Sequence, residues 1–405
     1  MLKIALLGFG VVGSGTAEVI TENQDRIRRA TGDGIEIKYI LDLREFPDSP
    51  FADRIVHDYN IILNDPEVTL VAEMMGGSHP AYDFTKAALL AGKSVVTSNK
   101  EVVAKFGTEL LQIADALGVY YLFEASVGGG IPILRAMAHD LASDRIMSVN
   151  GILNGTTNYI LTRMVEDGIS FEAALSEAQQ KGYAERDPSA DVDGHDAARK
   201  IVILCAMAYG VRYNPDEIPV QGIRTVKVEH VKLAAELGCA IKLIGHTAKD
   251  AQGKTQLWVA PCAVPNANPL SHIRDVFNGI LTDTDMLGQT MFYGRGAGKL
   301  PTAGAVVSDM TDIATHPYDS AIAQHWVDGS VIELSDPALE ISDYMVCCEG
   351  MATKLAEALG AAHFVGCSEC GYSAMIVKNT TRKALDAALT SARACATIYR
   401  VVCVM

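Results

Sequence analysis

The sequence predicts an α/β protein whose first third is a doubly wound parallel sheet, followed by an α+β domain and a small C-terminal domain. Three observations support this prediction. A short apolar strand at residues 3–7 leads into a glycine-rich turn and a helical pattern. Strands and helices then alternate to about residue 130. Residues 340–405 follow the different order strand, helix, strand, strand, helix, strand, which is that of ferredoxin-like folds.

The glycine-rich turn has the spacing of a Rossmann nucleotide-binding turn. Gly8, Gly10 and Gly13 form GxGxxG between the first strand and the first helix. The first glycine permits a tight turn, the second lets the backbone approach a pyrophosphate, and the third lets helix and strand pack closely. The helix N-terminus adds free N–H groups and partial positive charge. The predicted cofactor-binding residues here are Gly8, Phe9, Gly10, Val11, Val12 and Gly13.

Two further strands are predicted at residues 35–43 and 68–77, and a helix at 81–93. Two more strands, each with the loop that follows it, are predicted within residues 94–101 and 119–130. Ligands bind such sheets at the carboxyl ends of the strands. Thr97, Ser98 and Lys100 follow one of these ends and are therefore expected at the cofactor. Lys100 could equally be a solvated charge that begins a helix.

The end of the second strand bears on the choice of cofactor. Asp42 could bond a ribose 2′-hydroxyl, which favours NAD, whereas Arg44 could bind a 2′-phosphate, which favours NADP. Asp42 also lies further from the glycines than the usual spacing of about 20 residues. NAD or NADP is therefore expected, with a slight preference for NAD.

The middle of the chain carries two polar segments with open interpretations. In residues 146–164 a predicted strand is followed by a helix that begins at NGTTN. This helix N-terminus could bind an anion, or Asn154 or Thr156 could simply cap the helix. In residues 183–200, Asp196 and Lys200 are four apart and share a helix face. They could form an exposed ion pair, or Lys200 could donate a proton while the neighbouring acids orient it. Spacing alone does not decide.

Several motifs together resemble homoserine dehydrogenase over roughly residues 1–320. They are GFGVVGSG, SNKE, EASVGGGIPI, NGILNGTTNYIL, KGYAERDPSADVDGHDAARK and YGRGAGKLPTAGAVVSD, in the order found in that family. The resemblance implies interconversion of L-homoserine and L-aspartate 4-semialdehyde by hydride transfer to or from NAD or NADP, in threonine, methionine and isoleucine biosynthesis. In many relatives an arginine precedes the aspartate at the end of the second strand. This chain has Leu41 there, which weakens the case for strict NADP use.

The resemblance also implies roles for individual residues. Lys200 matches the catalytic lysine, Asp196 the acid that positions it, and Lys100 a second lysine near substrate and nicotinamide. The implied substrate-binding residues are Glu185, Asp191, Tyr183, Gly155 and Thr156. Gly298 matches a glycine that contacts the cofactor. A sodium-binding loop is implied at Glu124, Val127, Gly129 and Ile131, the last three through backbone carbonyls.

Residues 340–405 resemble the ACT regulatory domains that end longer members of this family. An ACT domain commonly binds an amino acid, so an effector such as threonine is one expectation. Dimerisation without an effector is equally compatible with the sequence. The expected division is a Rossmann domain at 1–130 with a helix at 300–318 returning to it, a catalytic and dimerisation domain at 131–299, and the ACT-like domain. A homodimer or homotetramer is expected.

Composition indicates which partners and which cellular location to expect. The net charge is −15 and there is no basic run, so nucleic acid and anionic membranes are not expected partners. No apolar run approaches the roughly 20 residues of a membrane helix, so the chain is expected to be soluble and cytoplasmic. Six of the nine cysteines lie after residue 346 and are interpreted as structural rather than metal-binding. Two alternatives are another nicotinamide reductase of amino-acid metabolism and a non-catalytic nucleotide or amino-acid sensor.

Overall fold

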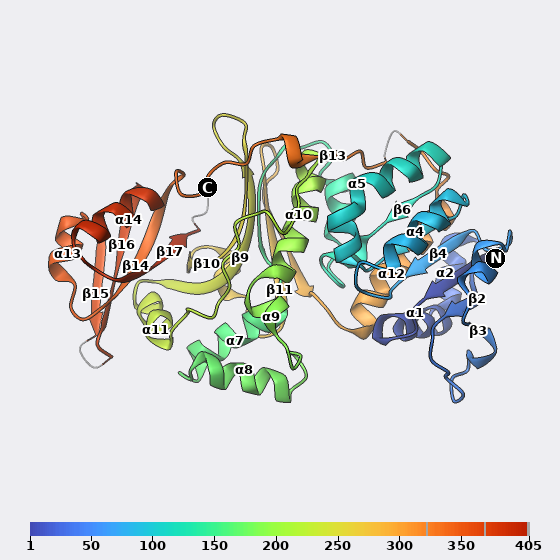
Figure 1. The fold of residues 1–405 in the computed structure, drawn as a ribbon, viewed down its shortest axis with the longest axis horizontal. Helices are drawn as coiled ribbons and strands as arrows, with labels where there is room; N and C mark the ends of the chain where they lie inside the picture. Colours follow the sequence, from blue (N-terminus) through green and yellow to red (C-terminus); the bar gives the residue numbers. More distant parts are fainter. Residues whose placement is uncertain (321–322, 368–369, 403–405) are drawn as a thin grey trace. The chain divides into compact units, whose positions relative to one another are not determined.

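Figure 1 shows the computed structural model, which describes residues 1–320, 323–367 and 370–402. The chain forms two compact units, each described here by itself. Unit 1 comprises Met1–Arg145, Val202–Pro215 and Gly294–Val331. Unit 2 comprises Ile146–Ile201, Asp216–Tyr293 and Ile332–Met405.

Unit 1 contains the predicted parallel sheet. Its six strands have the order β3-β2-β1-β4-β5-β6, and every neighbouring pair is parallel. This is the strand order of the Rossmann fold. The order in which successive strands are added to the sheet reverses between β1 and β4, although these two strands are parallel. The strands are β1 (Leu2–Leu7), β2 (Ile35–Leu41), β3 (Ile55–Val56), β4 (Leu70–Glu73), β5 (Ser94–Thr97) and β6 (Tyr121–Leu122).

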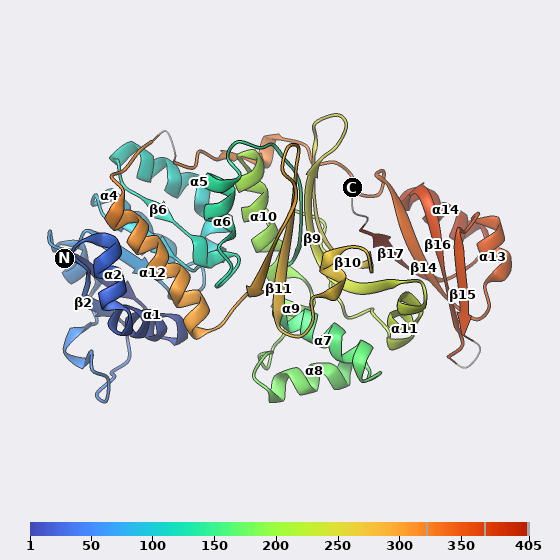
Figure 2. The same cartoon turned by 180° about the vertical axis from the view of Figure 1, so that it is seen from behind.

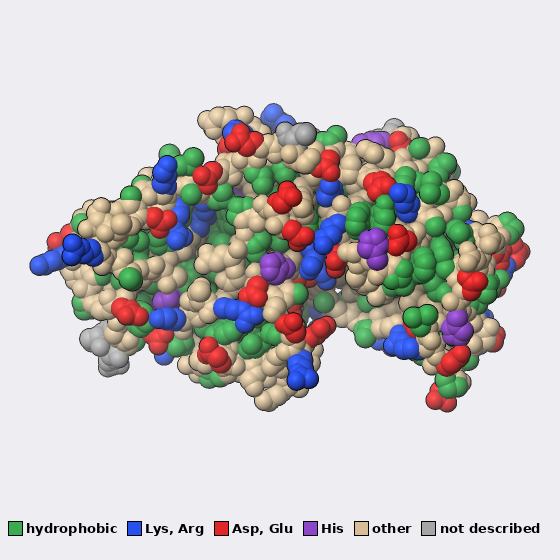
Figure 3. Space-filling model, in the orientation of Figure 1, with side chains coloured by type: hydrophobic (Ala, Val, Ile, Leu, Met, Phe, Trp, Pro, Cys, Tyr) green, Lys and Arg blue, Asp and Glu red, His purple; other side chains and the backbone are tan. Residues whose placement is uncertain are grey.

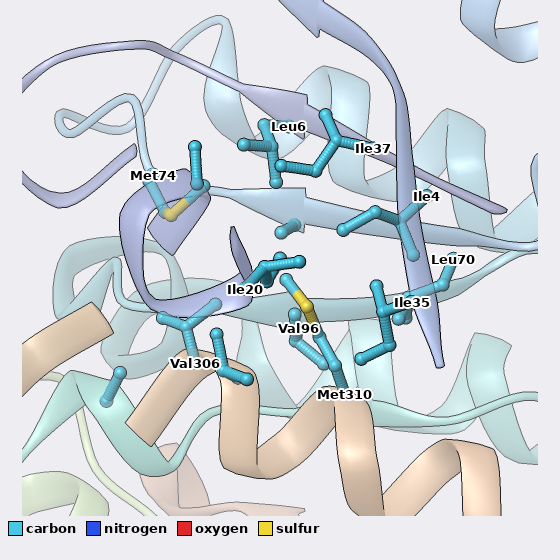
Figure 4. Packing of buried hydrophobic residues seen from close by; sticks show 14 of the residues in the cluster. Ile4, Leu6, Ile20, Ile35, Ile37, Leu70, Met74, Val96, Val306 and Met310 are labelled. Carbon is cyan, nitrogen blue, oxygen red and sulfur yellow. The ribbon is translucent and has the colours of Figure 1, made fainter. Parts of the chain in front are cut away.

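The helices that lie wholly in unit 1 come from distant parts of the chain. They are α1 (Val11–Glu22), α2 (Gln24–Thr31), α3 (Tyr59–Leu63), α4 (Ala81–Leu90), α5 (Lys100–Leu117), α6 (Ile133–Arg135) and α12 (Lys299–Thr315). Figure 4 shows Ile4 and Leu6 of β1 in one buried cluster with Ile20 of α1 and with Val306 and Met310 of α12. Seen from behind in Figure 2, α12 lies alongside α1 and α2. The two short strands β8 (Val211–Arg212) and β13 (Val327–Asp328) pair in parallel.

Unit 2 is built on a mixed sheet of nine strands in the order β12-β11-β7-β9-β10-β17-β14-β16-β15. The first five in the chain are β7 (Ile146–Ile152), β9 (Cys239–Lys249), β10 (Thr255–Pro265), β11 (Phe277–Thr284) and β12 (Gly288–Arg295). Strand β9 pairs antiparallel with β7 and β10, whereas β10 and β17 are parallel. The helices before the C-terminal segment are α7 (Gly155–Glu166), α8 (Phe171–Gln180), α9 (Ser189–Val192), α10 (His195–Tyr209, which continues into unit 1) and α11 (Val228–Glu236).

The C-terminal segment has the predicted element order. It consists of β14 (Ile341–Glu349), α13 (Thr353–Ala358), β15 (His363–Cys367), β16 (Tyr372–Thr381), α14 (Arg382–Ser391) and β17 (Ala396–Val401). Its strands lie in the order β17-β14-β16-β15 and pair antiparallel with one another. Its own apolar cluster includes Val346, Met375 and Leu385.

Two features of the structure relate to nucleic acid and membranes as partners: the distribution of charge on the surface and the apolar length of the helices. On the face drawn in Figure 3, lysines and arginines are interspersed with acidic side chains rather than gathered in one field. Within the part of the chain that the structure describes, no helix is long and apolar enough to cross a membrane.

The C-terminal cysteines are partly described. Cys347 and Cys348 on β14 are buried, and burial raises the pKa of the Cys347 thiol to about 12. Cys395 is exposed. Cys403 and the side chain of Cys367 lie outside the described residues.

Candidate active site

The glycine-rich turn joins β1 to α1 in unit 1, and close packing constrains two of its three glycines, Gly8 and Gly13. Gly8 has φ +93°, and a Cβ on it would lie 3.1 Å from the Met74 carbonyl oxygen. A Cβ on Gly13 would lie only 2.0 Å from the Gly8 carbonyl oxygen, closer than any Cβ contact allows. A Cβ on Gly10 would meet nothing within 4 Å. Open space therefore borders the N-terminus of α1, which fits the pyrophosphate of a dinucleotide.

Asp42, at the end of β2, lies beside this turn. Its Oδ2 accepts a hydrogen bond from the Phe9 backbone N–H at 2.8 Å. Arg44 donates to both carboxylate oxygens, from Nε at 3.0 Å and from Nη2 at 2.9 Å. The Arg44 guanidinium holds the pKa of Asp42 well below its usual range, and the Phe9 N–H acts in the same direction. Asp42 is therefore an anion near the turn, as the ribose-binding prediction requires.

The ends of β4 and β5 are held together by Glu73, which sequence reasoning missed. Its side chain is fully buried. Oε2 accepts the Thr97 hydroxyl at 2.7 Å, and Oε1 accepts the Met75 N–H at 2.8 Å. The Thr97 hydroxyl also accepts the Asn99 N–H at 2.9 Å, so it is already engaged inside the protein. The signal in the sequence was a single acid within the otherwise apolar run of residues 68–77.

The loop containing Ser98 and Lys100 leads directly into α5. Asn99 caps that helix by accepting the N–H groups of Glu101 and Val102, and its amide donates to the Gly77 carbonyl at 2.8 Å. Lys100 is the first residue of α5. The loops after β4 and β5 are therefore fixed relative to one another, at the sheet edge where a dinucleotide binds in this fold.

Gly298 lies at the N-terminus of α12, within unit 1. It is the N-cap residue and has φ +128°, a conformation that favours glycine. The start of α12 lies close to α1, because a Cβ on Gly15 would come 2.8 Å from Lys299 Cγ. Lys299 Nζ also forms an ion pair with Glu18 of α1 at 2.6 Å.

The loop expected to bind sodium is a compact turn in unit 1. Gly129 has φ +57°, and a Cβ on it would lie 2.5 Å from the carbonyl carbon of Gly296. The Glu124 carboxylate accepts the backbone N–H groups of Leu134 at 2.9 Å and Arg135 at 2.6 Å. Burial raises the pKa of Glu124, and these two donors oppose that shift. The Ile131 carbonyl accepts the Ile133 N–H at 2.9 Å. Across the described residues, no group of three or more His, Cys, Asp or Glu side chains could hold a metal ion.

The substrate half of the predicted site lies in unit 2, around the turn from β7 to α7. Lys200 and Asp196 on α10 are each only 6% exposed. Lys200 Nζ lies 2.9 Å from Asp196 Oδ2 and donates to the Leu153 carbonyl at 2.7 Å. The pair is therefore buried, and the interpretation as an exposed surface ion pair is wrong.

Four of the five acids in the segment 185–196 separate into two groups. Asp191 and Asp196 converge on the side chain of Asn154, at 2.7 and 2.9 Å from its Nδ2. Asp187 accepts the Ser189 hydroxyl, and Asp193 pairs with Arg224. These two acids have local structural partners. Burial, and next the charge of Asp196, raise the pKa of Asp191.

The other predicted substrate residues surround the N-terminus of α7. A Cβ on Gly155 would lie 2.7 Å from the Val276 carbonyl oxygen, so glycine is required there. The Thr156 hydroxyl donates to the Tyr183 carbonyl at 2.7 Å, which ties the acidic loop to α7. The side chains of Tyr183 and Glu185 are exposed on that loop.

Comparison with known proteins agrees with the motifs. The family model described as homoserine dehydrogenase matches residues 132–311, and the one described as homoserine dehydrogenase, NAD binding domain, matches residues 8–124. A homoserine dehydrogenase of Synechocystis sp. is 43% identical over 351 residues, covering 82% of this chain and 80% of that protein.

Solved structures extend the comparison to the whole fold. A homoserine dehydrogenase from Thiobacillus denitrificans has a TM-score of 0.90 and 30% identity, covering 100% of this chain and 99% of that one. A hyperthermophilic archaeal homoserine dehydrogenase mutant in complex with NADPH has a TM-score of 0.67 and 27% identity, covering 78% and 99%. With a Rossmann turn, a buried lysine–aspartate pair and relatives of this similarity, the chain belongs to the homoserine dehydrogenase family of oxidoreductases.

Proposed function

We propose that Lys200 moves the proton in the NAD(P)-dependent interconversion of L-homoserine and L-aspartate 4-semialdehyde. The observation that carries this proposal is the buried ion pair, with Lys200 Nζ 2.9 Å from Asp196 Oδ2. The bound nicotinamide supplies or accepts the hydride. Hydride transfer to an aldehyde builds negative charge on its oxygen, and a positioned ammonium group can neutralise that charge and supply the proton.

The remaining residues are proposed to bind and orient the substrate. Asp191 and Glu185 are acceptors for the α-ammonium group or the hydroxyl end. Gly155 and Thr156, at the N-terminus of α7, suit the α-carboxylate, because a helix N-terminus attracts anions. Tyr183 adds contact area beside them, and Lys100 is a second cation near the substrate and the nicotinamide.

The test is nicotinamide absorbance with L-homoserine, using NAD and NADP separately, for wild type, Lys200→Ala and Lys232→Ala. Lys232 is exposed on α11 and serves as the control. We expect Lys200→Ala to lose about a hundredfold or more in kcat and still bind homoserine, because general acid–base catalysis commonly contributes about 10²–10⁴-fold. Lys232→Ala should behave as wild type.

Oxidation of homoserine by the wild type should accelerate at alkaline pH, because Lys200 must be neutral before it can accept the hydroxyl proton. A flat pH profile in that direction would contradict Lys200 as the base. A wild type that is inert with both cofactors yet binds nucleotide would support the sensor interpretation instead.

Both nicotinamide cofactors are proposed to bind, with a slight preference for NAD. The Asp42 anion and Leu41 oppose a 2′-phosphate, while Arg44 favours one. NADP use is supported by the archaeal relative, which was solved in complex with NADPH. The predicted contacts at Thr97, Ser98 and Gly298 complete the proposed cofactor site.

A sodium ion is proposed at Glu124, Val127, Gly129 and Ile131. One carboxylate and three neutral carbonyls are oxygen donors of low total charge, which fits a hard cation. The tight packing of Gly129 supports a constrained loop. The ion would hold this loop and add no step to the chemistry.

We also propose that the three-domain division predicted from the sequence, 1–130 with 300–318, 131–299 and 340–405, is the functional one. The antiparallel order β17-β14-β16-β15 supports a ferredoxin-like, ACT-like C-terminal domain. That domain would bind an effector such as threonine, or only join subunits. Exposed apolar residues near the β11–β12 hairpin support a homodimer or homotetramer; they are Met286, Leu287, Met291 and Tyr293.

A further inference from the structure

The turn from β7 to α7 holds both members of the Lys200–Asp196 pair through two consecutive residues. The Leu153 carbonyl accepts from Lys200 Nζ at 2.7 Å, and Asn154 Nδ2 donates to Asp196 Oδ2 at 2.9 Å. The same oxygen of Asp196 faces Lys200, also at 2.9 Å. The ion pair on α10 is therefore aligned by a turn from another element, in addition to its own helix.

The Asn154 amide is engaged on both sides, which fixes its orientation. Its Oδ1 accepts the Thr157 N–H at 2.9 Å, and a backbone N–H can only donate, so the oxygen must face the helix. The two Nδ2 hydrogens are then left for the two carboxylates, Asp191 at 2.7 Å and Asp196 at 2.9 Å. The side chain is 5% exposed, so water does not compete freely for these bonds.

Two buried carboxylates facing one group would ordinarily repel each other, and one of them would then tend to take up a proton. A neutral amide that donates one hydrogen bond to each carboxylate opposes this without adding charge. The hydrogen bond from Asn154 lowers the pKa of Asp191, against burial and the charge of Asp196, which raise it. Lys200 is the cation of the same cluster and acts in the same direction.

We propose that Asn154 is a positioning residue that bridges Asp191 and Asp196, so that Asp196 stays aligned on Lys200 while Asp191 remains available to the substrate. Capping α7 is then only half of its role. This inference rests on the function proposed for Lys200, since it assigns the geometry by which that lysine is held.

Two substitutions separate bridging from capping. Asn, Asp and Ser are comparably good N-cap residues, so Asn154→Ser and Asn154→Asp both retain the cap on α7. Ser cannot reach two carboxylates with one hydroxyl hydrogen. Asp keeps the size and the cap of Asn, but it replaces the double donor with a third carboxylate. Melting temperature and the Kd for NADH report whether either variant damages the fold or the nucleotide half.

We expect kcat/KM for homoserine to fall about tenfold in Asn154→Ser and about a hundredfold in Asn154→Asp. In a plot of the oxidation rate against pH, the rate should rise as Lys200 loses its proton, and we call this rise the alkaline limb. We expect its midpoint to lie at least about half a pH unit higher in Asn154→Asp than in wild type, because added negative charge favours the protonated form of a neighbouring base. The limb should not move in Asn154→Ser.

If Asn154 served only as the cap of α7, Asn154→Ser would keep the wild-type kcat/KM, because serine retains the cap. The charge added in Asn154→Asp would displace its limb in either case. A wild-type kcat/KM in Asn154→Ser, with melting temperature and Kd for NADH unchanged, would therefore overturn the inference. An inert wild type would contradict the proposed function instead, so the two failures are distinguishable.

Discussion

At the residue scale, the charge of Asp42 is the feature most directly tied to cofactor choice. Its carboxylate accepts the Phe9 N–H and is held ionised by Arg44. An anion at the end of β2 suits a ribose hydroxyl and repels a 2′-phosphate. We expect Asp42→Ser to raise the ratio of kcat/KM with NADP to that with NAD about tenfold, the effect of ~1.4 kcal/mol. Initial rates with both cofactors measure this ratio.

Asp25→Ser is the matched control for this prediction, because Asp25 is an exposed acid of the same unit on α2. Its removal changes the net charge by the same amount and should leave the ratio unchanged. An Asp42→Ser enzyme with the wild-type ratio would show that Asp42 does not face the 2′ position.

Glu73 was not predicted from the sequence, and Asn154 was predicted only as a helix cap, for one shared reason. Lys200 and Asp196 could be predicted as a pair because a four-residue spacing puts them on one helix face. Glu73 and Asn154 act through contacts between elements, 24 residues from Thr97 in one case and 42 from Asp196 in the other. A single sequence shows that an acid ends a strand or that an asparagine begins a helix. It does not show which side chains the fold brings to them.

At the scale of elements, the β1–α1 turn contains two glycines with different roles: Gly13 allows close packing, and Gly10 leaves space for a ligand. A Cβ on Gly13 would clash with the Gly8 carbonyl at 2.0 Å, whereas a Cβ on Gly10 would meet only open space. We expect Gly13→Ala to lower both the melting temperature and the affinity for nucleotide. Gly10→Ala should keep the wild-type melting temperature without nucleotide and lose about tenfold or more in affinity, because its methyl group would occupy the approach of the pyrophosphate.

Differential scanning fluorimetry without nucleotide and fluorescence titration with NADH measure the two effects. The two variants are controls for each other, since both add one methyl group to the same turn. A Gly10→Ala protein with unchanged nucleotide affinity would contradict the assignment of this turn to the pyrophosphate.

Local periodicity was sufficient for the major elements of unit 1, including β1, β2 and β5. It did not predict β3, which has only two residues, Ile55 and Val56. Such a strand carries too short a pattern to be recognised and depends on pairing with β2 at Ile40 and Leu41. The nine-stranded sheet of unit 2 was also beyond prediction, because its β10–β17 junction pairs Cys262 with Arg400, far apart in the chain.

At the scale of the whole molecule, the β10–β17 junction connects the C-terminal segment to the other strands of the unit 2 sheet. Two residues of β10 pair with two of β17. Beyond these pairs, the Val402 N–H donates to the Ala263 carbonyl at 3.0 Å, and the Asn268 side chain donates to the Val402 carbonyl at 3.2 Å. A ligand of the C-terminal segment that prefers one arrangement of β17 could therefore bias β10, and through the sheet β9 and β7, which precedes Asn154. Such coupling requires different affinities for the two arrangements.

We expect L-threonine to lower the rate of homoserine oxidation and to raise the melting temperature of the full-length protein, with D-threonine doing neither. A ligand at about 100 times its Kd stabilises the native state by ~2.7 kcal/mol, which is a shift of several degrees for a protein of this size. Steady-state rates and scanning fluorimetry on the same samples measure both effects. If L-threonine changes the melting temperature but not the rate, the segment binds the amino acid without coupling to catalysis. If it changes neither, the result favours a C-terminal segment that joins subunits without binding threonine.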